Sequence, residues 1–190
     1  VLADSGIAVL GGTRSTTDSL QNLAARQGTA LAEVSSRPVK DWIFPVLNTS
    51  QNWYAEMLLK QLGRQFGGAG SWKAGLEVER RFLIDSMKVD STQFALRDGS
   101  GLSSSNLVSP KSFATLLTWM RAHPRFESFA AGLPQSGQRG SLKSRFVGTP
   151  LEGKVRAKTG SISRVNTLAG YIELPGRTLT FAVEANNHTL

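Results

Sequence analysis

Residues 154–185, KVRAKTGSISRVNTLAGYIELPGRTLTFAVEA, decide the fold. Lys154–Lys158 is typical of a short strand, and Val165–Leu174 is apolar at both alternating sets of positions. A strand with that pattern is covered on both faces of its sheet. Pro175-Gly176 then turns the chain, and Thr178–Ala185 returns as a third strand. The stretch therefore predicts an antiparallel hairpin with a further strand before it.

The middle of the chain has helical periodicity instead. Apolar residues from Trp53 to Leu62 form an i, i+4 stripe, and we expect Gly63 and then Gly67-Gly68 to end this helix. Ser71 is placed to cap a second helix, which runs to about Met87. The four tryptophans of this chain are expected in the core, although one could border a cleft: Trp42, Trp53, Trp72 and Trp119.

A third helix has the clearest boundaries. Ser109-Pro110 supplies a capping serine and a proline at the first helical position, and His123-Pro124 stops the helix. Helices that come first and a hairpin that comes last predict an α+β fold, with helices packed over an antiparallel sheet.

The first third of the chain gives weaker signals. Leu20–Arg26 is predicted as a short helix and Ala30–Ser36 as a strand that ends at Pro38. The apolar residues 42–47 fit either a helix or a buried strand, and residues 48–50 fit a turn or a helix cap.

Length and composition limit the class of protein. One domain is the default for 190 residues, and a hydrophobic fraction of 40% is sufficient for a packed core. No apolar run approaches the roughly 20 residues of a membrane-spanning helix. Val1–Leu10 lacks the basic flank of a signal peptide, and the absence of cysteine excludes disulfides and thiolate metal sites.

The net charge of +8 requires that a nucleic-acid partner be considered. The basic residues are scattered, however, and their densest stretch, 139–158, has Phe146 as its only aromatic residue. It therefore lacks the stacking platform of a single-strand binder, and we expect no nucleic-acid partner. No histidine spacing indicates a metal, no cofactor motif is present, and the absence of G-x-S-x-G argues against an α/β-hydrolase.

Lys158-Thr159-Gly160 is the strongest candidate for a site. A lysine at the end of a strand offers a fixed cation, the threonine adds a hydroxyl, and the glycine lets a ligand approach the backbone. This combination suits the binding of a carboxylate and an acyl group. The alternative is a lysine that only solubilises the end of a strand.

A second candidate lies at Ser50-Gln51-Asn52, directly before the helix that begins near Trp53. One interpretation is structural, with Ser50 as the N-cap of the helix. The other is functional, with a hydroxyl that passes on a proton and an amide that holds a substrate amide.

Together these segments resemble the second and third motifs of the penicillin-binding and serine β-lactamase superfamily. The resemblance is specific for the D-alanyl-D-alanine carboxypeptidase/endopeptidase family, the class C low-molecular-mass penicillin-binding proteins. It covers about residues 36–187. The matching segments, in family order, are 50–59, the glycine loop 98–103, 140–146 (GSLKSRF), 155–161 and 166–171.

One motif of that family is missing. The family attacks its substrate with the serine of an S-x-x-K motif, which occurs nowhere in this sequence. We therefore expect residues 1–35 to be the end of an upstream inserted region with its junction. Residues 36–190 would be the C-terminal part of the peptidase domain, trimmed before the final helix and without the nucleophile.

The resemblance implies a serine-type D-Ala-D-Ala carboxypeptidase or endopeptidase that acts on peptidoglycan stem peptides and is acylated by β-lactams. It assigns Ser50, Asn52 and Lys158 to catalysis and Thr159, Gly160 and Ser161 to substrate binding, with the Ser161 N–H as an oxyanion donor. It also implies a periplasmic or extracytoplasmic bacterial location. The alternative is a non-catalytic module that binds a peptide carboxylate or the cell wall, and the sequence leaves the oligomeric state open.

Overall fold

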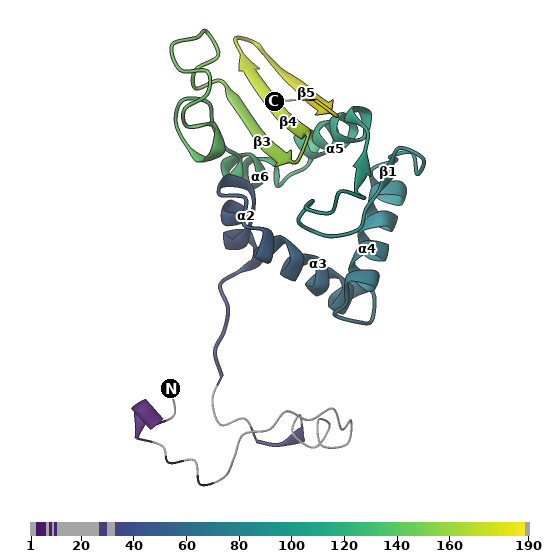
Figure 1. Ribbon diagram of the computed structural model, residues 1–190, viewed down its shortest axis with the longest axis vertical. Helices are drawn as coiled ribbons and strands as arrows, with labels where there is room; N and C mark the ends of the chain where they lie inside the picture. Colours follow the sequence, from purple (N-terminus) through teal and green to yellow (C-terminus); the bar gives the residue numbers. More distant parts are fainter. Residues whose placement is uncertain (1–2, 7, 9, 11–26, 30–32, 189–190) are drawn as a thin grey trace. The chain divides into compact units, whose positions relative to one another are not determined.

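A computed structural model of the chain describes residues 3–6, 8, 10, 27–29 and 33–188 (Figure 1). The chain divides into two compact units, Val1–Ser36 and Arg37–Leu190. In the first unit, η1 (Ala3–Ser5) is a short 3-10 helix, and the helix predicted over Leu20–Arg26 lies outside the described residues. The predicted strand is wrong for residues 33–36, because no neighbouring strand in the described ranges offers them a hydrogen-bonding ladder.

The second unit combines helices with an antiparallel sheet, which confirms the α+β prediction. The apolar residues 42–47 belong to a helix, so the alternative of a buried strand is excluded. The elements in chain order are α2 (Val39–Asn48), α3 (Asn52–Phe66), α4 (Trp72–Arg81), η2 (Phe82–Ser86), β1 (Phe94–Ala95), β2 (Leu107–Val108), α5 (Pro110–Ala122), α6 (Phe126–Gly132), η3 (Gly140–Leu142), β3 (Val155–Ile162), β4 (Val165–Leu174) and β5 (Arg177–Asn186).

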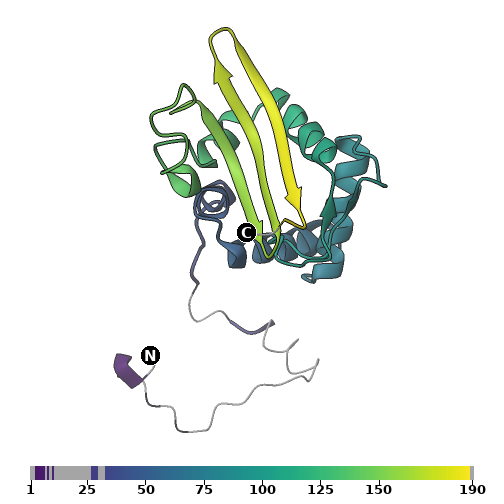
Figure 2. The same cartoon turned by 45° about the horizontal axis from the view of Figure 1, so that its top comes forward.

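The main sheet has the strand order β3-β4-β5, and all its pairs are antiparallel (Figure 2). β3 is longer than predicted and carries Lys158, which pairs with Ala169 of β4. β3 is therefore an edge strand with one side open to other segments. A small second sheet pairs β1 with β2.

The prediction that both faces of β4 are covered holds only in part, because on the second face Val183 and Leu179 of β5, which pair with Leu168 and Ile172, are 60% and 42% exposed. On one face, Tyr171 is buried and its hydroxyl donates to the Leu117 carbonyl of α5 at 2.8 Å. On the other, Leu168 and Ile172 pack against a cluster of buried residues. That cluster consists of Leu142, Val155 and Ala157.

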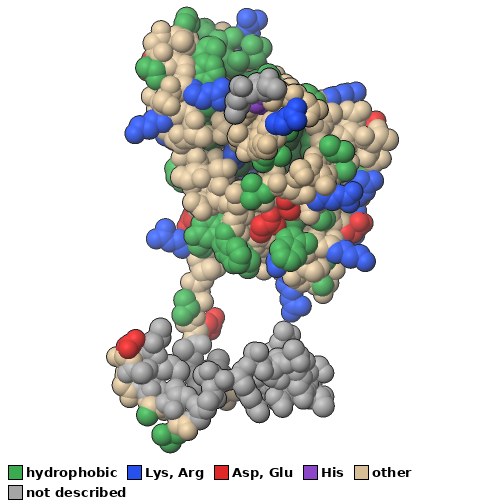
Figure 3. All heavy atoms as spheres, in the orientation of Figure 1, with side chains coloured by type: hydrophobic (Ala, Val, Ile, Leu, Met, Phe, Trp, Pro, Cys, Tyr) green, Lys and Arg blue, Asp and Glu red, His purple; other side chains and the backbone are tan. Residues whose placement is uncertain are grey.

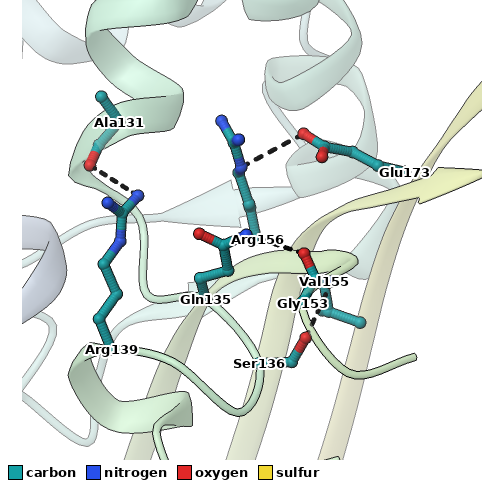
Figure 4. A network of polar contacts seen from close by, with 8 residues as sticks. All are labelled: Ala131, Gln135, Ser136, Arg139, Gly153, Val155, Arg156 and Glu173. Carbon is teal, nitrogen blue, oxygen red and sulfur yellow. Dashed lines mark hydrogen bonds and ion pairs between the residues drawn. The ribbon is translucent and has the colours of Figure 1, made fainter. Parts of the chain in front are cut away.

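The loop before β3 covers the first half of the open edge (Figure 4). Ser136 N donates to the Val155 carbonyl at 2.9 Å, and Val155 N donates to Ser136 Oγ at 3.1 Å. Ala157 N donates to the Pro134 carbonyl at 3.1 Å. Among the described residues, no backbone hydrogen bond of this kind covers the edge beyond Ala157, so the Lys158 end of β3 is the accessible part.

α3 and α4 cross at two glycines. A Cβ on Gly63 would lie 2.6 Å from Gly75 N, and a Cβ on Gly75 would overlap the Leu59 carbonyl oxygen. The prediction that Gly63 ends α3 is therefore wrong, because this glycine allows close packing inside the helix, which continues to Phe66. Gly67 does cap the helix, and its N–H donates to the Gly63 carbonyl at 2.9 Å.

The same crossing decides which face of α3 is buried. Leu59 and Gly63 are its buried residues, whereas Trp53 is 71% exposed and Met57 47% exposed. The predicted apolar stripe thus includes residues on the outer face of the helix. The expectation of core tryptophans is wrong for Trp53 and for Trp72, which is 50% exposed.

The predicted serine caps are confirmed. Ser71 Oγ accepts from Ala74 N at 3.2 Å at the start of α4, and Ser109 Oγ accepts from Ser112 N at 3.2 Å at the start of α5. The helix predicted to reach Met87 consists of α4 followed directly by the π-helical η2.

Candidate active site

The amine of Lys158 reaches Ser50 across 108 positions of sequence. Lys158 Nζ donates to Ser50 Oγ at 2.8 Å and to the Thr159 carbonyl at 2.6 Å. The lysine comes from the accessible end of β3 and the serine from the connection between α2 and α3. Two segments that the sequence singled out separately therefore meet in one place.

The α2–α3 connection holds Ser50 in an unusual conformation. Thr49 Oγ1 and Gln51 N both donate to the Pro45 carbonyl, at 2.9 and 3.1 Å, and Ser50 between them has a φ of 56°. A positive φ is uncommon for a residue with a side chain and is frequent at functional sites. The N-cap of α3 is Gln51, so the interpretation of Ser50 as the helix cap is wrong.

The partial burial of Lys158 affects the pKa of its amine. Desolvation lowers the pKa of the Lys158 amine, because a charged group loses hydration when it is buried. The two hydrogen bonds of the amine replace part of that hydration. The site therefore presents a positioned amine that is easier to deprotonate than a lysine on the surface.

Thr159 contacts a segment for which sequence reasoning gave no chemistry. Thr159 Oγ1 donates to Ser141 Oγ at 2.7 Å, and Ser141 lies in η3. The family resemblance includes the segment 140–146 but implies no chemical role for it. The contact between η3 and β3 could not be predicted from the periodicity of the sequence, because no local pattern relates a 3-10 turn to a distant strand.

Gly160 and Ser161 continue β3 beyond the lysine, and both are exposed. Gly160 pairs with Thr167 of β4, and a Cβ on this glycine would overlap Thr167 Oγ1. Along an edge strand, backbone groups of alternate residues point outward. Val155 and Ala157 use their outward N–H groups for the loop, so the Ser161 N–H has the same outward direction.

Asn52 is the first residue of α3 and lies two positions after Ser50. Within the described ranges, no hydrogen bond joins its side chain to Lys158 or Ser50. Asn52 instead lines a hollow of about 470 Å³ at the start of α3. The other lining residues come from α3, α4 and the segment after β1: Trp53, Glu56, Trp72, Arg97, Asp98, Ser100 and Leu102.

Glu56 fixes the glycine loop beside this hollow. Its carboxylate accepts from Gly99 N at 3.2 Å, from Ser100 N at 2.9 Å and from Trp72 Nε1 at 2.7 Å. Burial raises the pKa of Glu56, but hydrogen bonds from Ser100, Trp72 and Gly99 outweigh it, and the net shift is downward. Gly101 has a φ of 80°, as expected for a turn that needs a positive φ.

The surface offers no concentrated basic patch on the face shown in Figure 3, where lysine and arginine side chains are scattered. Within residues 33–188 and the shorter described ranges, no group of three or more potential metal ligands is found. No described helix combines the length and apolar character required to cross a membrane.

Solved structures identify the fold class. The chain superimposes on penicillin-binding protein 4 (DacB) from Haemophilus influenzae, in complex with a β-lactam, with a TM-score of 0.80 and 27% identity. The match covers 86% of this chain and 38% of that chain. A β-lactamase from Sphaerobacter thermophilus matches with a TM-score of 0.54 and 22% identity, over 83% of this chain and 57% of that one. The fold is thus of the penicillin-binding and serine β-lactamase class.

The sequence comparison is more specific. The D-Ala-D-Ala carboxypeptidase 3 (S13) family matches residues 2–190, and the chain belongs to this family. A D-alanyl-D-alanine carboxypeptidase of Actinomadura sp. (strain R39) is 37% identical over 84% of this chain, and penicillin-sensitive carboxypeptidase A of Dictyostelium discoideum is 33% identical over 82%. The chain spans 30% and 31%, respectively, of the length of these relatives.

Proposed function

We propose that this chain forms the part of a serine-type D-Ala-D-Ala carboxypeptidase that binds the substrate and activates the leaving group. The observation that carries the proposal is the hydrogen bond of 2.8 Å between Lys158 Nζ and Ser50 Oγ. The attacking serine would come from a part of the protein outside these 190 residues and form an acyl-enzyme.

Lys158 and Ser50 would act as a pair. The lysine supplies a cation for the terminal carboxylate of the D-Ala-D-Ala peptide, and Ser50 passes a proton to the leaving amine. The lowered pKa of Lys158 supports this proposal, because an amine that is easier to deprotonate exchanges protons with a hydroxyl more readily.

The remaining site residues would position the substrate. Thr159 would assist with the carboxylate, Gly160 would let the substrate approach β3, and Asn52 would hydrogen-bond a substrate amide. The outward direction of the Ser161 N–H supports its assignment as one oxyanion donor. Peptidoglycan stem peptides and β-lactams would be the ligands, and the cell wall of a bacterium, outside the cytoplasm, the location.

The alternative is a module that binds a peptide carboxylate or the cell wall without catalysis. It is favoured by the absence of an S-x-x-K motif from the sequence, whereas the pocket for a carboxylate would be the same. The balance between carboxypeptidase and endopeptidase activity belongs to the proposal and requires assays on intact peptidoglycan fragments.

A labelled β-lactam distinguishes the two functions. We expect a covalent adduct, seen as an increase in intact mass, on a polypeptide that also carries the upstream sequence of this protein. This chain alone should give none. An adduct on the chain alone would show that it contains a nucleophile, and no adduct on the longer polypeptide would favour the binding module.

A further inference from the structure

We propose that the open edge of β1 binds an extended acidic peptide segment of a partner protein. The site is a groove of about 470 Å³ between α4 and β1 (Figure 1). It is lined by residues 94–97 and by one face of α4, which carries Lys73, Leu76, Glu77 and Arg80. Successive side chains of a strand point to opposite faces, so a groove that contacts four consecutive residues lies along the edge of the strand. Binding there requires neither Lys158 nor Ser50 and is therefore independent of the proposed function.

The hydrogen bonds on the β2 side show which backbone groups of β1 face the groove. The Gln93 carbonyl accepts from Ser109 N at 2.9 Å, and Arg97 N donates to Asn106 Oδ1 at 2.7 Å. The backbone groups of alternate residues in a strand point to opposite sides. The odd-numbered residues of 93–97 therefore face β2, and the even-numbered residues face the opposite side.

The outward backbone groups are those of Phe94 and Leu96. In the parts of the chain that the structure describes, no hydrogen bond joins their N–H or C=O groups to another segment. A strand edge with free donors and acceptors is a template for an added strand. Because a polypeptide offers matching donors and acceptors at the same spacing, the edge of β1 favours a peptide over other anionic polymers.

The charges around the groove favour acidic side chains in that peptide. Lys73, Arg80 and Arg97 make no ion pair with any described residue. The carboxylate of Glu77, which also lines the groove, lies 3.9 Å from Arg81 Nε, and this cation offsets its charge. A second copy of this chain is a poor occupant, because its net charge is +8.

Apolar side chains also line the groove. Leu76 and Leu96 are partly buried, and Phe94 is 7% exposed. Arg80 Cζ lies 5.5 Å from the centre of the Phe94 ring, so this cation lies beside the apolar part of the groove. A peptide in which acidic and apolar residues alternate would contact both the cations and the apolar side chains.

The test uses the longer polypeptide that carries the upstream sequence, with a fluorescein-labelled peptide of about six residues in which valine and glutamate alternate. Fluorescence anisotropy should show binding that weakens as salt is added. Amide hydrogen exchange should slow at Phe94 and Leu96, because their N–H groups become donors to the peptide. Ala95, which already pairs with Leu107, should change little.

Variants of the groove test the contribution of its cations. Lys73→Ala and Arg80→Ala should each raise the Kd of the peptide about threefold to fivefold, as expected for exposed charges. The Lys73 variant remains informative if the Arg80 variant disturbs β1, whose Phe94 ring Arg80 contacts. Arg64→Ala is the matched control and should bind like the wild type, because Arg64 is an exposed cation of α3 that does not line the groove.

Slower exchange at Phe94 and Leu96, together with weaker binding by the two groove variants, would support the peptide site. Equal binding by all variants, with displacement by polyphosphate as readily as by unlabelled peptide, would indicate a general attraction of anions and overturn the proposal. Unchanged exchange at the two amides would also overturn it. So would the absence of binding to the wild type, as expected if another part of the protein covers β1.

Discussion

The end of β3 and the helical region around α4 each bury an ionisable group, and the two groups differ in their hydrogen bonds. Lys158 donates hydrogen bonds to Ser50 and to the Thr159 carbonyl. Glu79 on α4 has a buried Oε2 with no hydrogen-bond partner within the described ranges. Burial lowers the pKa of Lys158, whereas burial and the nearby charge of Asp98 raise the pKa of Glu79 to about 7.

The difference shows what hydrogen bonds do for a buried charge. At the end of β3 they give the amine of Lys158 a direction, which suits it to act on a ligand. At Glu79 the missing partner leaves a carboxyl group whose charge opposes folding. Substitutions at the end of β3 should therefore change chemistry more than stability, and substitutions around α4 should do the reverse.

Lys158→Ala should have the largest effect. In the longer polypeptide we expect acylation by a β-lactam to slow about 100-fold or more, because a positioned charge near the reacting group is lost. The midpoint of thermal unfolding should change little, since the lysine is only partly buried. The measurement is the rate of adduct formation by intact mass.

Lys154→Ala is the matched control, because Lys154 is an exposed lysine just before the same strand. It should acylate at the wild-type rate. If Lys158→Ala were acylated at the wild-type rate, Lys158 would have no role in the mechanism. The contrast between a chemical role for the end of β3 and a stabilising role for the region around α4 would then also fail.

Glu79→Gln should change the pH dependence of stability. A folded-state pKa of about 7, raised from 4.5, means that the contribution of Glu79 is fully present below pH 4.5 and is lost as the pH rises through 7. From this group alone, the free energy of unfolding should fall by about 2–3 kcal/mol between pH 5 and pH 8. In Glu79→Gln, this decrease in the free energy of unfolding should be absent, because glutamine does not ionise.

Urea unfolding of this chain at both pH values measures the effect. Glu77→Gln is the control, because the Glu77 side chain on the same helix is 63% exposed. The pH dependence of this control should match the wild type. If Glu79→Gln retained the full pH dependence, the burial of an unpaired carboxyl would not be its cause.

The sequence predicted the three strands of the main sheet, the helices capped by Ser71 and Ser109, and the glycine loop, because these depend on local patterns. The alternation in Val165–Leu174 and the serines at 71 and 109 act within a few residues, and their positions match the structure. The family resemblance assigns Ser50 and Lys158 to one site, and the structure places them in contact although 108 positions separate them. The catalytic assignments of these residues remain predictions.

The errors lie where distant segments decide the outcome. Gly63 is inside a helix because α4 crosses there, and Trp53 is exposed because the buried face of α3 is centred on Leu59. The contact between Thr159 and Ser141 was missed for the same reason. Each depends on packing between elements that have no common periodicity.

Gly75→Ala tests whether the helical region depends on close packing. The added Cβ would overlap the Leu59 carbonyl oxygen of α3, so α4 would have to move. We expect a loss of about 1–3 kcal/mol in the free energy of unfolding, as is common for overpacked sites. Gly70→Ala is the control, because its Cβ would lie 3.8 Å from Arg64 Cβ, which is an ordinary contact. Equal stability of the two variants would contradict the close crossing.

Ser71→Ala should have the smallest effect and tests the start of α4. Ser71 Oγ accepts from Ala74 N at 3.2 Å, and loss of an N-cap costs about 1 kcal/mol. Ser71→Asp keeps an acceptor at this position and should retain wild-type stability in urea unfolding, whereas alanine should not. β-Lactam acylation of the longer polypeptide should be the same for both variants, because α4 contributes no residue to the Lys158–Ser50 contact. If Ser71→Ala were acylated more slowly than the wild type and Ser71→Asp were not, the cap of α4 would influence the Lys158–Ser50 site. The conclusion that substitutions around α4 change stability and not chemistry would then be wrong.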